Sequence, residues 1–226
     1  RKELHKRYGT DKQRCGMKQG WFISLEGVDG SGKSTQIQTT AAWLKEQGYE
    51  VLVTREPGGT ANAEKIRNIV LDADVPLQPR TELLLYLAAR AQHVAEVIKP
   101  ALAAGRIVLC DRFVDSTLVY QGIVRGLDLR RIKELNEFAS EELMPALTLL
   151  LDADPALLEE RRRERGVTDR FEQEGLSFQK KLREGFLFLA EKEPERIRKV
   201  DALQAPEQVQ AEIRCLLKEA GIGRGL

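Results

Sequence analysis

Short apolar runs rich in β-branched residues alternate along the chain with longer segments in which apolar residues recur every three or four positions. This alternation predicts βαβ units and hence a parallel sheet. Most of the short runs are apolar on both faces, which is typical of central strands covered by helices on two sides. The pattern therefore predicts an α/β fold with three layers around a central sheet of five parallel strands. We expect these strands at residues 21–26, 49–54, 106–111, 147–152 and 196–200.

The longer segments each carry an apolar stripe spaced for one face of a helix. No repeat, linker or low-complexity tract divides them, so we expect one domain over residues 21–226. Residues 1–20 hold seven Lys or Arg and almost no apolar periodicity, and we expect either a basic tail or a segment foreign to the native protein, between which the sequence does not decide. A nucleic-acid-binding arm is the alternative, but charge runs without interleaved aromatic residues usually face solvent. The expected stripes are Ile37, Ala41 and Leu44; Leu84, Leu87, Ala91, Val94 and Ile98; and Val209, Ile213, Leu216, Leu217 and Ala220.

Charge and cysteine content narrow the possible partners and compartment. Of the 226 residues, 36 are basic and 35 acidic, and the net charge of +1 creates no overall field that would attract duplex nucleic acid or an anionic membrane. The three cysteines, Cys15, Cys110 and Cys215, make neither a disulfide framework nor a CxxC metal pair. No apolar run approaches the ~20 residues that span a bilayer. We therefore expect a soluble, cytoplasmic protein without nucleic-acid or membrane partners.

The stretch GVDGSGKS, residues 27–34, stands between the first expected strand and a helix and matches the pattern GxxxxGK[ST]. Glycines let successive N–H groups turn inward as an anion cradle at a helix N-terminus. Lys33 can then reach the β- and γ-phosphates, and Ser34 can hold Mg²⁺. A glycine-rich structural turn is the alternative. We expect a nucleoside triphosphate, with Mg²⁺, to contact Gly27, Val28, Asp29, Gly30, Ser31, Gly32, Lys33, Ser34 and Thr35.

Two further segments select among the classes of protein that share a P-loop. The chain has no NKxD guanine motif and little room for the second module of a helicase. Asp111 and Arg112 follow the third expected strand, so Asp111 can complete the magnesium shell and Arg112 can face an anion; a buried Asp–Arg ion pair is the alternative. Residues 161–173 combine a run of arginines with Gly166, as expected of a mobile lid that closes over a transferring phosphoryl group. A solvated helix with intrahelical ion pairs would have a similar composition.

Several motifs stand together in one order: LEGVDGSGKST, TREPGGT, YLAARAQH, DRFVDSTLVYQG, RGLD and DRFEQE. In this combination the chain resembles the thymidylate kinase family, in its bacterial form, from about Gly20 to Ala220. The resemblance implies a P-loop NTPase fold, phosphorylation of dTMP to dTDP by ATP and Mg²⁺ in dTTP synthesis, and a homodimer.

The resemblance also implies roles in binding the acceptor nucleotide. Asp29 matches the carboxylate that meets the sugar 3′-hydroxyl, although an aspartate here could instead cap the following helix. Tyr86 matches the aromatic residue that stacks on thymine, and Arg90, one helical turn later, the arginine that reads O4; a core tyrosine beside a surface arginine is the alternative. The positions that line the base and sugar pocket correspond to Thr117, Tyr120 and Gln121, of which Thr117 could equally serve helix packing.

For the transfer itself, the resemblance assigns Arg112 to the acceptor phosphate and an arginine of the lid to the moving phosphoryl group. We favour Arg165, beside Gly166, and expect Asp29, Lys33 and Arg112 to complete the catalytic set. The acceptor phosphate is mostly dianionic at neutral pH, so no general base is required and neither His5 nor His93 is assigned. Arg161 and Arg163 are expected to support Arg165, and Asp169 and Glu172 to organise the closed lid. The loop 55–59 resembles the acceptor-side loop of the family, with Pro57 as a cis proline, and residues 201–209 resemble the loop that covers adenine.

Two other functions remain open from the sequence. Another nucleoside monophosphate or deoxynucleoside kinase would share the P-loop and the DRF segment, but it would have no need of YLAAR and STLVYQG together. A non-catalytic P-loop module would bind an NTP without rapid transfer. The sequence does not rank dTMP against dUMP, since one methyl group is worth only about 1 kcal/mol in a binding pocket.

Overall fold

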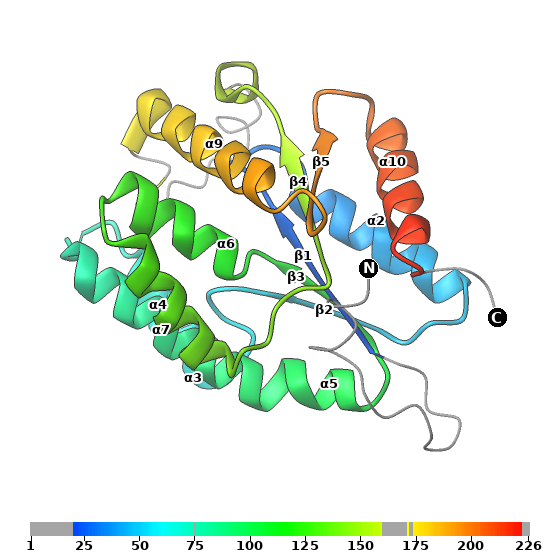
Figure 1. The fold of residues 1–226 in the computed structure, drawn as a ribbon, viewed down its shortest axis with the longest axis horizontal. Coiled ribbons are helices and arrows are strands. Elements are labelled where there is room, and N and C mark those ends of the chain that lie inside the picture. The colour runs from blue at the N-terminus through cyan, green and yellow to red at the C-terminus, as the bar shows by residue number, and fades with distance from the viewer. Residues whose placement is uncertain (1–19, 75, 160–170, 172–173, 223–226) are drawn as a thin grey trace.

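The computed structural model describes residues 20–74, 76–159, 171 and 174–222. Its strands form one parallel sheet in the order β2-β3-β1-β4-β5 (Figure 1). This confirms the predicted five-stranded parallel sheet, and each strand lies within two residues of its expected position. The strand bounds are β1 Trp21–Glu26, β2 Val51–Arg55, β3 Ile107–Asp111, β4 Leu147–Asp152 and β5 Ile197–Asp201.

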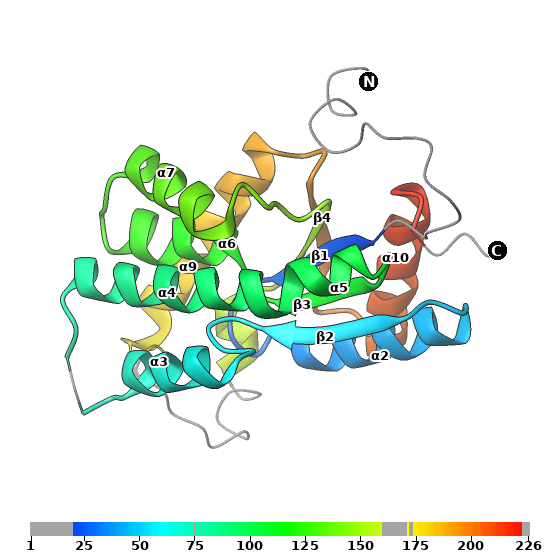
Figure 2. The same ribbon diagram turned by 90° about the horizontal axis from the view of Figure 1, so that it is seen from below.

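Helices cover both faces of this sheet, which confirms the predicted three layers (Figures 1 and 2). One face is covered by α2 (Lys33–Glu46) and α10 (Pro206–Glu219), which also pack on each other. The other face is covered by α5 (Lys99–Ala103), α6 (Val114–Thr117) and α9 (Gly175–Lys192). Outside that layer lie α3 (Ala61–Leu71), α4 (Pro79–His93) and α7 (Leu129–Ser140). Two π-helical turns continue helices: η1 (Val94–Ile98) follows α4, and η2 (Leu118–Val124) follows α6. A 3₁₀ turn, η3 (Pro155–Leu158), follows β4.

The central strands form the rigid part of the molecule. In β1 and β4 every residue from Phe22 to Leu25 and from Leu147 to Leu151 is buried, because helices cover both sides of the sheet. Truncating one such buried leucine to alanine typically costs 2–5 kcal/mol of stability. The loops that follow these strands are therefore anchored to a firmly packed base.

Two of the three expected helical stripes needed correction. In α4 the side chain of Leu84 is 59% exposed and Ala91 is exposed, whereas Leu83, Leu87 and Arg90 are buried. Three consecutive leucines made the phase of this helix ambiguous, and the buried face contains an arginine, which an apolar pattern does not detect. The last stripe is correct through Leu217, but Ala220 is exposed beyond the end of α10.

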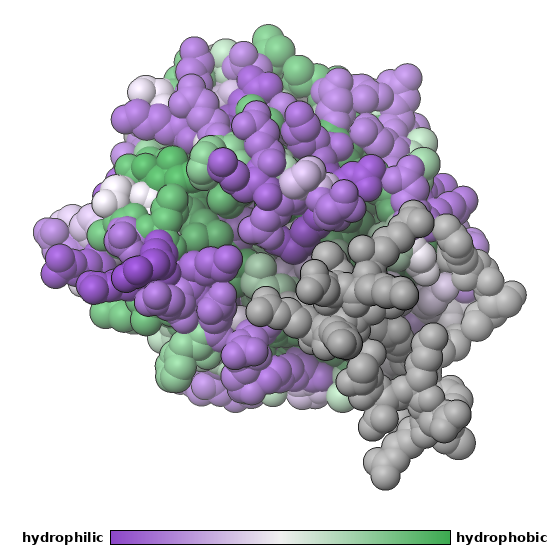
Figure 3. Space-filling model, in the orientation of Figure 1, coloured by the Kyte–Doolittle hydropathy of each residue, from purple (hydrophilic) through white to green (hydrophobic). Residues whose placement is uncertain are grey.

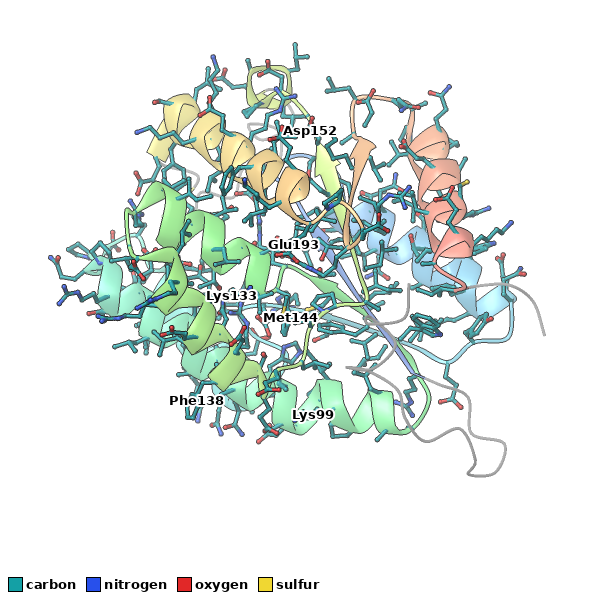
Figure 4. The ribbon with its side chains drawn as sticks, in the orientation of Figure 1. Lys99, Lys133, Phe138, Met144, Asp152 and Glu193 are labelled. Atoms are coloured by element: carbon teal, nitrogen blue, oxygen red, sulfur yellow. The ribbon has the colours of Figure 1, made fainter. Side chains whose placement is uncertain are left out.

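The strand order places several polar segments at one edge of the sheet. Strand β1 pairs with both β3 and β4, so the segments that follow these three parallel strands lie side by side. The P-loop follows β1, Arg112 follows β3, and Asp152 ends β4, where Figure 4 labels it. Open α/β sheets bind ligands at this carboxyl edge. Within the described residues, none of the helices is long and apolar enough to cross a membrane.

Candidate active site

The P-loop connects β1 to α2 as a turn that requires glycine. Gly27 has φ 139° and Gly32 has φ 89°, values that other residues rarely adopt. A Cβ atom on Gly27 would lie 2.4 Å from the carbonyl oxygen of Leu151, so no side chain fits there. The turn leads into the first N–H groups of α2, which have no acceptor within the helix and favour an anion. In the same loop the buried hydroxyl of Ser31 has no hydrogen-bond partner in the described structure.

Lys33 folds back over this loop. Its Nζ donates to the carbonyl oxygens of Gly27, at 3.0 Å, and Val28, at 3.1 Å, and it lies 3.9 Å from Asp29 Oδ1. Burial and, after it, the nearby Arg112 guanidinium lower the pKa of the Lys33 amine to about 8, against the opposing effect of nearby carboxylates. Negatively charged phosphate in the cradle would favour the protonated amine, so phosphate binding and the charge of Lys33 are coupled.

Arg112 brings a second cation to the same place. Its Nη2 donates to Asp29 Oδ1 at 2.7 Å, and its Nη1 donates to the carbonyl oxygen of Gly27 at 3.0 Å. The guanidinium also lies over the Tyr120 ring, 5.3 Å from its centre. The structure therefore pairs Arg112 with Asp29 and not with Asp111. The N-cap residue of α2 is Gly32 and not Asp29.

Ser34 and Asp111 meet at the entrance of the cradle. Ser34 Oγ donates to Asp111 Oδ2 at 3.4 Å, while Asp111 Oδ1 is buried without a hydrogen-bond partner in the described structure. An orphaned carboxylate oxygen beside a serine hydroxyl fits Mg²⁺, which prefers oxygen ligands and usually binds one or two protein groups together with substrate phosphates. The described residues contain no cluster of three or more His, Cys, Asp or Glu that could hold a metal by itself.

An aromatic wall adjoins Arg112. Tyr120 packs edge to face against Phe171, with ring centres 5.4 Å apart, and against Phe178, at 6.2 Å. Burial raises the pKa of the Tyr120 hydroxyl well above its usual range, and Tyr86 is among the nearby groups that raise it further. Tyr86 and Arg112 therefore both lie close enough to Tyr120 to influence its ionisation. The wall offers flat apolar surface next to a guanidinium.

Arg90 is buried, with 1% of its surface exposed. Its Nε donates to Glu56 Oε2 at 2.8 Å, and its Nη1 donates to Thr117 Oγ1 at 2.9 Å and to Asn136 Oδ1 at 2.5 Å. This overturns the alternative of a surface arginine. Gln121, also buried, donates from Nε2 to Glu82 Oε1 at 2.7 Å.

The sequence analysis missed several buried polar residues around the site. Glu56 holds both Arg90 and His93, whose Nδ1 lies 3.0 Å from Glu56 Oε1. Glu26, the last residue of β1, contacts the backbone N–H of Phe113. A carboxylate ending an otherwise apolar strand, directly before the P-loop, was the available signal for Glu26. Glu56 stands in the TREPGGT motif, before the Glu56–Pro57 bond, which is cis as predicted.

Several of the lid residues proposed from the sequence, namely Arg161, Arg163, Arg165, Asp169 and Glu172, lie outside the described residues, as does the tail 1–19.

The loop expected to cover adenine connects β5 to α10. At its end Gln36 Nε2 donates to the carbonyl oxygen of Pro206 at 3.0 Å. A groove lined by residues of α2 and α10 begins here, between Thr35 and Pro206.

Comparisons with known proteins agree with this architecture. The family model described as thymidylate kinase matches residues 25–213. The chain is 56% identical over 192 residues to a thymidylate kinase of Syntrophotalea carbinolica, covering 80% of this chain and 88% of the relative. It is 47% identical over 205 residues to that of Deinococcus radiodurans, covering 91% and 100%. The solved structure of thymidylate kinase from Ehrlichia chaffeensis superposes with a TM-score of 0.72 at 35% identity, covering 88% of this chain and 99% of that one. These matches span most of the chain, which therefore belongs to the thymidylate kinase family.

Proposed function

We propose that this chain transfers the γ-phosphoryl group of ATP to the phosphate of dTMP, giving dTDP and ADP, in the cytoplasm. The observation that carries the proposal is the placement of Arg112, whose guanidinium bonds both Asp29 and the Gly27 carbonyl of the P-loop. One phosphate site, the P-loop, thereby has a second cation directly beside it. That is the arrangement needed for two phosphate-bearing ligands that meet end to end.

The acceptor nucleotide lies, in this proposal, along the line from Asp29 to Arg90. Asp29 accepts a hydrogen bond from the sugar 3′-hydroxyl, and Tyr86 stacks on thymine. Arg90 already commits Nε and Nη1 to protein acceptors, so Nη2 is the group that donates to thymine O4. Tyr120 closes the sugar side and favours deoxyribose. Supporting positions around the base are assigned to Thr117 and Gln121.

Transfer rests on placement and charge rather than on proton abstraction. The acceptor phosphate is mostly dianionic at neutral pH and already nucleophilic. Lys33 and Arg112 hold the two phosphates in line and offset the charge that spreads over the moving group, and Arg165 of the lid adds a third cation. Mg²⁺, held through Ser34 and Asp111, supplies further neutralisation of the donor phosphates when it is bound.

Substitution of Arg112 tests the proposal. We expect Arg112→Ala to lower kcat about a hundredfold or more, because a cation aimed at the transferring group is lost. Arg198→Ala is the matched control, since Arg198 forms an exposed ion pair with Glu219. A variant Arg112→Ala with wild-type kcat at saturating dTMP would refute the role given to Arg112.

We also propose that the chain forms a homodimer through α3, α4 and α7. These helices lie next to one another, α4 packing on both α3 and α7 (Figures 1 and 2). They expose Ile69 (49%), Leu84 (59%) and Phe138 (85%), and Figure 4 shows Phe138 pointing away from the body of the molecule. Figure 3 shows hydrophobic areas among the hydrophilic ones on the part of the surface where α4 and α7 lie. Exposed apolar side chains on adjacent helices are typical of an interface.

Sedimentation velocity distinguishes this interface from ordinary surface exposure. We expect Phe138→Asp to shift the protein from dimer to monomer. Phe188→Asp, which changes an exposed phenylalanine on α9, should leave the dimer intact. Equal sedimentation of wild type and Phe138→Asp would place the contact elsewhere.

A further inference from the structure

Glu26 is a fully buried carboxylate directly beneath the phosphate site. It ends β1, in which the preceding four residues are also buried, and none of its surface is exposed. Glu26 Oε1 accepts the backbone N–H of Phe113 at 2.7 Å, and Glu26 Oε2 accepts the Ser116 hydroxyl at 2.6 Å. Both donors belong to the segment that follows β3. Glu26 therefore ties the start of the P-loop to that segment.

Both hydrogen bonds lead to Arg112. The backbone of Arg112 has φ 67°, the left-handed region, which a residue other than glycine adopts at a cost of about 1 kcal/mol or more. Its N–H donates to Leu25 O at 2.9 Å, and the next N–H, that of Phe113, donates to Glu26. Ser116 Oγ, which donates to Glu26, accepts from Arg112 Nη1 at 3.3 Å. Glu26 thus fixes Arg112 through its backbone and through its side chain.

The location of Glu26 is costly for the fold. Burial and, after it, the neighbouring Asp115 carboxylate raise the pKa of this carboxyl to about 7, against the opposing effect of Arg112 and the two hydrogen bonds. Lys33 also faces this group. An uncharged side chain of the same size would be less expensive at this position. A residue that weakens the fold and holds a residue of the site has the pattern expected of a functional role.

We propose that Glu26 is a positioning residue for phosphoryl transfer, holding the turn at residues 111–113 so that the Arg112 guanidinium stays beside the P-loop. The inference rests on the role proposed above for Arg112. Glu26 has no exposed surface and does not touch the reacting groups. Its effect is therefore on the geometry of the acceptor phosphate site, and a small misplacement of such a site can cost about a hundredfold in rate.

Steady-state kinetics of Glu26→Gln, with dTMP and ATP varied separately, tests this inference. Gln keeps an oxygen for the Phe113 N–H but cannot accept the Ser116 hydroxyl with its amide nitrogen. We expect kcat/KM for dTMP to fall tenfold to a hundredfold, roughly the cost of a displaced positioning group, with KM for ATP changed less than twofold. The melting temperature should not fall. Ser24→Ala, a buried change two residues earlier in β1, is the matched control and should keep wild-type kinetics.

A double-mutant cycle shows whether Glu26 acts through Arg112. If it does, adding Glu26→Gln to Arg112→Ala causes little further loss of kcat/KM. Wild-type kinetics of Glu26→Gln, or losses that multiply in the double variant, would overturn the inference while leaving the role of Arg112 intact. An Arg112→Ala enzyme with wild-type kcat would instead refute the proposed function itself.

If Glu26→Gln does not fold, Ser116→Ala provides a second test, because it removes only the hydroxyl that links the Glu26 and Arg112 side chains. This variant should also lower kcat/KM for dTMP, and an unchanged value would count against the inference.

Discussion

Replacing Glu26 by glutamine should make the protein more stable at alkaline pH, even though the substitution removes a charged group that accepts two hydrogen bonds. Burial of the Glu26 carboxyl, with Asp115 beside it, raises its pKa from the ordinary 4.5 to about 7. In the unfolded chain the same carboxyl is in water and ionises at its ordinary pKa. The folded state therefore binds a proton more tightly than the unfolded state does.

The sign and the size of the effect follow from this difference in pKa. At pH below 4.5 the carboxyl is protonated in both states, and its titration does not affect stability. Between pH 4.5 and 7 the unfolded state ionises first, so the free energy of unfolding falls as pH rises, and above pH 7 the full cost remains. A difference of this size corresponds to about 3 kcal/mol, at about 1.4 kcal/mol for each pH unit. Roughly 2 kcal/mol of it develops between pH 5.5 and 8.5.

Urea unfolding of wild type and Glu26→Gln at pH 5.5 and pH 8.5 measures this contribution. Glutamine does not titrate, so the stability of the variant relative to wild type should rise by about 2 kcal/mol between the two pH values. Titrating groups that do not interact with Glu26 affect both proteins alike and cancel in the comparison. A variant whose relative stability is the same at both pH values would show that Glu26 ionises normally in the folded protein, and the cost argued for this carboxylate would be wrong.

Three further substitutions have defined outcomes. Because the pKa of Lys33 is about 8, ATP binding at pH 8 should take up about half a proton. Calorimetry should therefore give binding enthalpies that depend on the buffer for wild type and not for Lys33→Met. Wild-type enthalpies that do not depend on the buffer would contradict this. Arg165→Ala should lower kcat about a hundredfold while changing KM for dTMP far less, and wild-type turnover at saturation would remove Arg165 from the mechanism. Arg90→Met should lower the free energy of unfolding in urea by about 3 kcal/mol or more, because Glu56 is left buried without the Arg90 guanidinium. A loss below about 1 kcal/mol would show that the ion pair between Arg90 and Glu56 is not important for stability.

The sheet and the position of the P-loop could be predicted because their signals are local. A strand that is apolar on both faces is visible within six residues, as in Leu147–Asp152. Gly27, Gly32 and Lys33 sit within one short motif, and its place between a strand and a helix follows from the flanking residues. Parallel topology then places the segments after β1 and β3 at one edge without any knowledge of side-chain contacts.

The buried polar network could not be predicted, because its partners are far apart in the sequence. Glu56 meets Arg90 across 34 positions, and Glu26 meets Phe113 across 87. Which face of α4 turns inward depends on these contacts as much as on its leucines. Arg90 is buried because Glu56, Thr117 and Asn136 satisfy it, and a hydrophobic pattern carries no information about such partners.

A coupled assay of ADP formation, with ATP, Mg²⁺ and each nucleoside monophosphate in turn, tests the central claim most directly. In the proposed function the site holds two phosphate-bearing nucleotides end to end, with the acceptor base between Tyr86 and Arg90. The account predicts that rapid ADP formation requires dTMP and that dTDP appears in equal amount. ADP formation at the same rate without an acceptor, or faster with AMP, CMP or GMP than with dTMP, would contradict it.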